Sequence, residues 1–95
     1  QLDYEIYLII WDIRSKTPIH DHADNGCWLK VLEGEVNEKK YSGNLSLIYN
    51  NIYKKDDISY MNNNIGFHSI NNLDNISYTL HVYSPPNYKT IYFSV

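Results

Sequence analysis

Short apolar stretches alternate with clusters of Asn, Asp, Gly and Pro along most of this 95-residue chain. No window of helical length carries a sustained apolar stripe at i, i+3 and i+4, which argues against amphipathic helices. Many short apolar-alternating segments with turn signals at close spacing indicate an all-β sandwich or jelly-roll barrel. We expect strands at residues 4–13, 27–32, 35–41, 45–53, 58–61, 67–71, 77–83 and 90–94.

Three turn signals separate these segments. Gly34 lies between two expected strands and predicts a tight hairpin, because glycine tolerates the backbone angles that sharp turns require. Asn64–Gly66 predicts a further turn, and Asn71–Asn75 predicts a longer loop.

Composition narrows the classes of function. The formal net charge of −3 leaves no basic surface for a nucleic acid. No apolar run approaches the roughly 20 residues that a transmembrane helix needs, and the first ten residues do not read as a signal peptide. The single cysteine, Cys27, cannot form an internal disulfide and fits a reducing compartment. We therefore expect one cytoplasmic, monomeric domain over residues 1–95, with no nucleic-acid or membrane partner.

Strand parity brings two histidines together. Residues i and i+2 of a strand point the same way, roughly 6.6 Å apart, so His20 and His22 can aim at one point while Asp21 points away. Two imidazoles from one rigid strand lower the ordering cost of a metal site, and His68, after the Gly66 turn, is the best remaining third ligand. From this spacing alone, surface or core histidines remain an equal alternative.

The same parity places Thr79, His81 and Tyr83 in one row, with Leu80 and Val82 on the opposite face. Hydroxyl, imidazole and phenol groups are unusual in an apolar core. This row is a reasonable lining for a polar pocket.

The surrounding pattern resembles the cupin superfamily. Cupins carry a first motif with His-x-His and a downstream glycine, which here is His20-Asp21-His22 followed by Gly34, and a second motif that His68 and Asn72 resemble. The usual glutamate ligand after His-x-His is missing, because Cys27 occupies its position.

One cupin family has a cysteine there. The segment Pro18–Gly34 resembles the first motif of the cysteine dioxygenases, Ile65–His68 resembles their second motif, and Leu80–Pro86 resembles the strand that carries their tyrosine. Trp11 lies at the matching distance before His20. The resemblance covers nearly the whole chain and implies a small cupin-type β-barrel.

The resemblance also implies a cofactor and a reaction. His20, His22 and His68 would bind one Fe(II), and the missing carboxylate ligand would leave the site one charge more positive, which favours a thiolate. The substrates would be L-cysteine and O2, and the product cysteine sulfinic acid, a step of cysteine catabolism.

The remaining site residues follow from the same resemblance. Cys27 and Tyr83 match the pair that forms a thioether crosslink in many animal-type members, and the Tyr83 hydroxyl would lie near the open face of the iron. His81 would contact Tyr83, Thr79 would retain a hydroxyl at the end of the row, and Trp11 would form a wall of the pocket.

The family's substrate anchor has no equivalent in the sequence. Its members bind the substrate carboxylate with an arginine well before Trp11, and the ten residues before Trp11 contain none. Arg14, the only arginine, either replaces it or is a solvated loop residue. Either the N-terminal part of the family is missing from this chain, or the chain is a reduced member.

Three alternatives remain open. The thiol substrate could be 3-mercaptopropionate, although enzymes of that type usually lack the crosslinking cysteine. The three histidines could instead hold zinc, nickel or copper in a non-catalytic or degenerate cupin, because imidazoles suit all these metals. A hydrolase with Cys27 as its nucleophile would need a nearby base and an oxyanion site.

Overall fold

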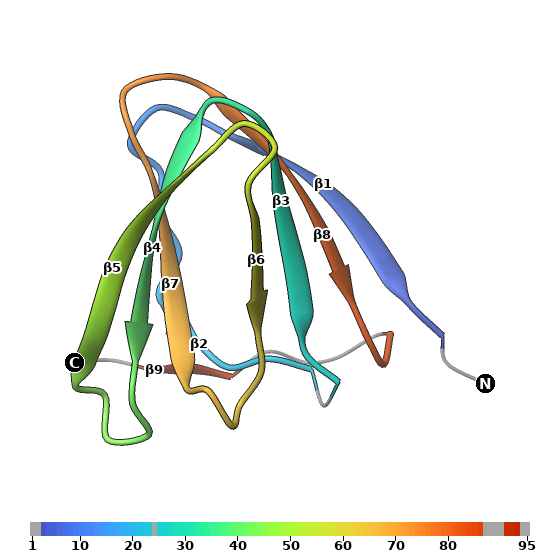
Figure 1. The fold of residues 1–95 in the computed structure, drawn as a ribbon, viewed down its shortest axis with the longest axis vertical. Coiled ribbons are helices and arrows are strands. Elements are labelled where there is room, and N and C mark those ends of the chain that lie inside the picture. The colour runs from blue at the N-terminus through green and yellow to red at the C-terminus, as the bar shows by residue number, and fades with distance from the viewer. Residues whose placement is uncertain (1–2, 24, 87–90, 94–95) are drawn as a thin grey trace.

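The computed structural model describes residues 3–23, 25–86 and 91–93, and these residues form strands, turns and bends without any helix (Figure 1). Accordingly, no helix in these ranges is long and apolar enough to cross a membrane. The strands are β1 (Glu5–Trp11), β2 (Ile19–His20), β3 (Cys27–Glu33), β4 (Glu35–Tyr41), β5 (Leu47–Lys54), β6 (Ile58–Met61), β7 (Phe67–Asn72), β8 (Ser77–Tyr83) and β9 (Tyr92–Phe93).

The strands form two antiparallel sheets that face each other. One sheet has the order β1-β8-β3-β6, and the other has the order β5-β4-β7-β2-β9. Figure 1 shows the sheets close together at the end where β3 passes into β4, with β2 and β9 lying across the opposite end. This arrangement confirms the expected all-β fold.

The prediction of a hairpin at Gly34 is wrong. β3 and β4 flank this glycine, but they belong to different sheets, so the chain crosses from one layer to the other there. Gly34 has φ +80°, and a Cβ at this position would lie 2.3 Å from the hydroxyl oxygen of Ser77. Only glycine meets both demands without strain, which explains why a turn residue is needed where no hairpin forms.

Apolar side chains from both sheets fill the interior between them. Trp11 and Val31 from the first sheet pack with Val36 and Ile70 from the second, and each is at most 6% exposed. Burying one such aliphatic side chain contributes about 1.5–3 kcal/mol. This cluster holds the two layers together.

The outer face of β1 is also apolar. Ile6, Leu8 and Ile10 alternate with the inward-facing Ile9 and Trp11, and the three outer side chains are 58–65% exposed. The segment from Glu5 to Trp11 is therefore apolar on both faces, so its orientation could not be read from polarity.

The expected strands agree with the structure to within a few residues, with two exceptions. β2 was not expected as a separate strand, and it contains only Ile19 and His20. The expected strand at residues 90–94 appears as β9, Tyr92–Phe93, while residues 90 and 94 lie outside the described residues. The turn at Asn64–Gly66 is confirmed by hydrogen bonds from the backbone N–H groups of Ile65 and Gly66 to the carbonyl of Asn62.

Candidate metal centre

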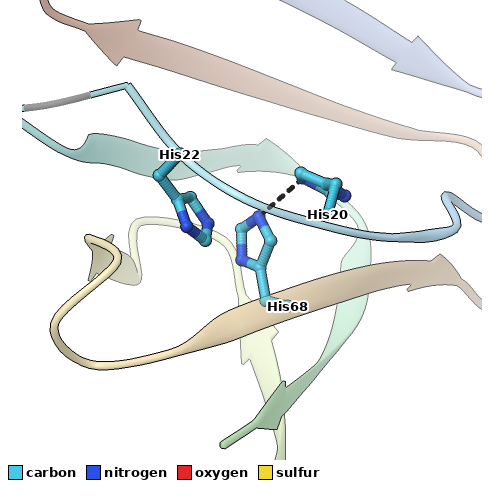
Figure 2. A group of neighbouring side chains, drawn as sticks. All are labelled: His20, His22 and His68. Carbon is cyan, nitrogen blue, oxygen red and sulfur yellow. Dashed lines mark hydrogen bonds between the residues drawn. The ribbon is translucent and has the colours of Figure 1, made fainter. Parts of the chain in front are cut away.

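Three imidazole rings converge between β2 and β7 (Figure 2). His20 and His68 are paired across the two strands, and His22 follows His20 by two residues. The ring centroid of His68 lies 4.5 Å from that of His20 and 4.2 Å from that of His22. One ring nitrogen from each histidine lies within 4.8 Å of the other two. The residues expected as metal ligands are thus brought together.

The hydrogen bonds behind two of these rings fix their tautomers. Nδ1 of His20 lies 2.9 Å from the carbonyl oxygen of Pro18, and Nδ1 of His68 lies 2.7 Å from the carboxylate of Glu38. Both partners only accept hydrogen bonds, so both Nδ1 atoms must carry a proton, which leaves Nε2 of each ring as the nitrogen available to a metal.

These two Nε2 atoms face each other at 2.9 Å. Two lone pairs at this distance repel unless a proton or a metal cation is shared between them. Two nitrogens bound to one ion at about 2.0–2.1 Å would lie about 2.9–3.4 Å apart for angles between 90° and 109°. The spacing of His20 and His68 therefore suits a shared metal ion.

The surroundings of the His22 ring also favour a metal ion. Both of its ring nitrogens are buried and have no hydrogen-bond partner among the described residues. Asn63 anchors its backbone, accepting from the His22 N–H at 2.9 Å and donating to the His22 carbonyl at 3.2 Å. A buried imidazole without a polar partner is costly, and binding a metal would remove that cost. The donor set therefore fits a metal ion.

Burial favours the neutral form of His20 and His22, as metal ligation requires. Burial, with the nearby imidazole of His68, lowers the pKa of His20 to about 4. Burial and then the imidazoles of His68 and His20 lower the pKa of His22 to about 2. Neutral imidazoles at pH 7 can bind a cation without first releasing a proton.

The histidine pair is not carried by one strand as expected. β2 ends at His20, and His22 lies in the irregular segment that follows. Asp21 is 7% exposed, and its carboxylate accepts a hydrogen bond from the backbone N–H of Ile91 at 2.8 Å. Anchoring by Asp21 and Asn63, rather than strand pairing, holds His22 beside the other two rings.

Glu38 was not identified from the sequence. It lies on β4, is 1% exposed, and contacts His68 through one oxygen and the hydroxyl of Ser59, at 2.8 Å, through the other. Burial acts to raise its pKa, but the hydrogen bond and charge of His68, together with Ser59 and Lys40, outweigh burial and lower the pKa. Its position in an expected strand of alternating polarity was the only available signal, and that pattern could not show its partner.

A cavity of about 220 Å³ opens in front of the three histidines. Most of the predicted site residues line it, including Trp11, Cys27, His81 and Tyr83. The other described lining residues are Tyr7, Ile9, Thr17, Asp21, Ala23, Ile70 and Tyr92, with the histidines themselves. The cavity is thus mostly apolar and aromatic, with a few polar groups aimed inward, as small-molecule sites usually are.

The predicted row on β8 forms a buried chain of hydrogen bonds. The indole N–H of Trp11 donates to the hydroxyl of Thr79 at 2.7 Å, and that hydroxyl lies 2.7 Å from Nε2 of His81. Thr79 is fully buried, and Trp11 also belongs to the apolar core. Burial, with the imidazoles of His68 and His20, lowers the pKa of His81 to about 4. The contact of His81 that was expected with Tyr83 is thus made with Thr79.

Cys27 and Tyr83 lie directly opposite each other on β3 and β8. Side chains of such a pair have Cβ atoms about 4.5–5.5 Å apart on the same face of the sheet. Burial, with the charge of Glu38, raises the pKa of Cys27 to about 11. A nucleophilic cysteine needs the opposite shift, so nothing here favours a hydrolase.

Two further tyrosines at the cavity were not singled out from the sequence. Tyr7 on β1 stacks on Tyr83, with ring centroids 5.6 Å apart, and its hydroxyl donates to the carboxylate of Glu5. Tyr92 on β9 is paired with His20 across the strands. Tyrosine is common in this chain, which has ten, so composition gave no reason to choose these two.

Arg14 is not brought to the cavity. Its guanidinium pairs with the carboxylate of Asp74 at 2.6 Å, and both side chains are about three-quarters exposed. Among the described residues that line the cavity, none is an arginine or a lysine. The structure thus shows Arg14 as a solvated loop residue.

Comparison with known proteins identifies the family. The family model described as cysteine dioxygenase type I matches residues 2–94. The chain belongs to the cysteine dioxygenase type I family. It is 30% identical over 91 residues to cysteine dioxygenase type 1 of Bos taurus, and 28% identical over 91 residues to that of Homo sapiens. Each alignment covers 87% of this chain and 46% of the relative. The chain thus spans about half the length of these cysteine dioxygenases.

Solved structures confirm the cupin fold of this cysteine dioxygenase family member. The cupin domain of Drosophila melanogaster CENP-C superposes with a TM-score of 0.72 at 18% identity, covering 87% of this chain and 69% of that one. Bacillus subtilis oxalate decarboxylase superposes with a TM-score of 0.79 at 14% identity, covering 94% of this chain and 23% of that one. At these identities the likeness concerns the fold alone.

Proposed function

We propose that this chain forms the catalytic core of an iron-dependent thiol dioxygenase that converts L-cysteine and O2 to cysteine sulfinic acid. The single observation that carries the proposal is the convergence of three imidazoles in the wall of a cavity, with two buried ring nitrogens of His22 that have no partner among the described residues. Membership in the cysteine dioxygenase type I family supports the choice of reaction.

His20, His22 and His68 would hold the ion. A ferrous ion bound there supplies redox chemistry and a positive charge that favours the thiolate form of a substrate at neutral pH. The reaction adds both atoms of O2 to the thiol sulfur, so sulfur is oxidised, dioxygen is reduced, and no other reductant is needed.

The cavity walls would orient the substrate and exclude water. Trp11 and Ile70 offer apolar contact surface, and Tyr83 brings a hydroxyl that can donate a hydrogen bond to the substrate. His81, held by Thr79, is the second polar group on the same strand that faces the cavity.

A thioether bond between Cys27 and Tyr83 is part of the proposal. The cross-strand register supports it, because the two residues are partners on one face of the sheet. Joining Sγ to a carbon of the Tyr83 ring would break the S–H bond and one ring C–H bond, and the two electrons and two protons released would reduce one O2 to hydrogen peroxide. The bond would fix the Tyr83 ring beside the cavity.

The metal is tested first. The chain is purified without oxygen, its metal content is measured, and ferrous iron is supplied to the metal-free form. We expect one iron per chain, and we expect His68→Ala to lose metal and activity together, because two imidazoles seldom hold a labile ferrous ion. Stoichiometric iron without oxidation of any thiol would instead favour a non-catalytic metal-binding cupin.

The substrate is tested by oxygen uptake. The iron-loaded chain is assayed with L-cysteine and with 3-mercaptopropionate at equal concentrations, and sulfinic acid is measured in parallel. Higher turnover with L-cysteine is expected. Equal or higher turnover of 3-mercaptopropionate would contradict the assignment of L-cysteine while leaving the thiol dioxygenase reaction in place.

A further inference from the structure

A buried carboxylate, that of Glu38, contacts Nδ1 of His68, while Nε2 of the same ring faces His20. Glu38 projects inward from β4, where it is the cross-strand partner of Ile70, and His68 is the partner of Lys40 two residues along. Glu38 and His68 are thus diagonal neighbours on one face, about 7–8 Å apart at Cα, a distance that a glutamate side chain spans. Its carboxylate reaches Nδ1 of His68 at 2.7 Å.

The two oxygens of Glu38 have separate partners. Oε1 accepts from the hydroxyl of Ser59 at 2.8 Å and lies 3.8 Å from the ammonium of Lys40. Oε2 is left for His68. Ser59 and Lys40 therefore hold the carboxylate in place, and the oxygen that faces the histidine is aimed by contacts on the other side of the group.

We propose that Glu38 is a positioning residue of the metal centre: by accepting the Nδ1 proton of His68 it forces the Nε2 lone pair toward the ion and fixes the ring's orientation. The inference rests on the metal centre proposed above. Carboxylates that hydrogen-bond to ligating histidines make the imidazole a better donor. The three-imidazole set has no carboxylate ligand. Glu38 supplies a negative charge next to the ligand His68 instead.

His20 shows the contrast. Its Nδ1 donates to a neutral backbone carbonyl, that of Pro18, so its tautomer is fixed without any charged partner. Glu38 is therefore expected to affect the basicity of His68 more than that of His20, to which it has no hydrogen bond, and the three imidazoles should not be equivalent.

The test compares Glu38→Gln with Glu35→Gln, which makes the same chemical change at an exposed position of the same strand. Metal-free protein is titrated with Zn(II), as the probe, against a competing chelator. Glu38→Gln should bind Zn(II) about 10- to 100-fold more weakly than the wild type. Glu35→Gln should bind it as the wild type does. Wild-type affinity in a folded Glu38→Gln chain would overturn the inference.

A second measurement needs no variant. Nitrogen-15 NMR of the metal-free wild-type chain should show a proton on Nδ1 of His68, and an unprotonated Nδ1 would overturn the inference even if Glu38→Gln does not fold. Failure of the wild-type chain to bind Zn(II) or Fe(II) would contradict the metal centre itself. Metal binding with an unchanged Glu38→Gln affinity would contradict only the role of Glu38.

Discussion

Removing the hydroxyl of Thr79 isolates the contribution of the hydrogen-bond chain on β8. Thr79→Val replaces that hydroxyl with a methyl group of similar size, so the fully buried site is not emptied. The indole N–H of Trp11, a residue only 6% exposed, then loses its acceptor at 2.7 Å. An unsatisfied buried donor costs about 1–3 kcal/mol, so the free energy of unfolding should fall by about 2 kcal/mol.

Urea unfolding of the metal-free chain, followed by circular dichroism, measures this loss. A double-mutant cycle with Trp11→Phe separates the hydrogen bond from packing, because the N–H is already absent in that background. Thr79→Val should then cost about 1–2 kcal/mol less than in the wild type. Equal costs in both backgrounds would refute the reasoning.

Three further predictions concern pH, the thioether bond and the crossing between the sheets. Because the pKa of His81 is lowered to about 4, the unfolded chain binds more protons than the folded chain below about pH 6.5. The contribution of His81 to the free energy of unfolding is therefore fully present above that pH and is lost as the pH falls toward 4. Between pH 7 and pH 5, the free energy of unfolding measured in urea should fall by about 2 kcal/mol less in His81→Gln than in the wild type. An equal fall in the two proteins would contradict burial of a neutral His81 ring. Cys27→Ser should keep its metal, and its turnover should fall on the order of tenfold. In the wild type, tandem mass spectrometry should find a loss of two hydrogens from a bond between Cys27 and Tyr83, and Cys27→Ser should lack this loss. A wild-type chain that shows no such loss after turnover would contradict the bond. Gly34→Ala, at φ +80°, should lower the free energy of unfolding by more than about 1 kcal/mol in thermal melts. Gly43→Ala, with open space around it, should not. Equal effects of the two substitutions would contradict the strain expected where the chain crosses between the sheets at Gly34.

The sequence was sufficient for most of the strands and, together with the family resemblance, for the grouping of the histidines. The apolar alternation predicted most strand positions to within a few residues, and strand parity placed Thr79 and His81 on one face, as the hydrogen bond between them shows. The His-x-His spacing also indicated a shared target for His20 and His22.

The remaining features depend on contacts between distant strands, which local patterns do not encode. Gly34 was read as a hairpin because a turn signal does not say whether the next strand pairs with the previous one or joins the other sheet. Glu38 was missed because its role requires the register of β4 against β7. The support of His22 by Asn63, 41 residues away along the chain, was hidden for the same reason.

The most direct test of the account follows the oxygen atoms. Ferrous chain is supplied with L-cysteine under ¹⁸O₂, and the sulfinic acid product is analysed by mass spectrometry, with His22→Ala as the comparison. The account predicts cysteine sulfinic acid carrying both oxygen atoms from dioxygen in the wild type and none of this product from His22→Ala. Full iron loading without labelled sulfinic acid, or equal product from His22→Ala, would contradict a thiol dioxygenase built on the three histidines.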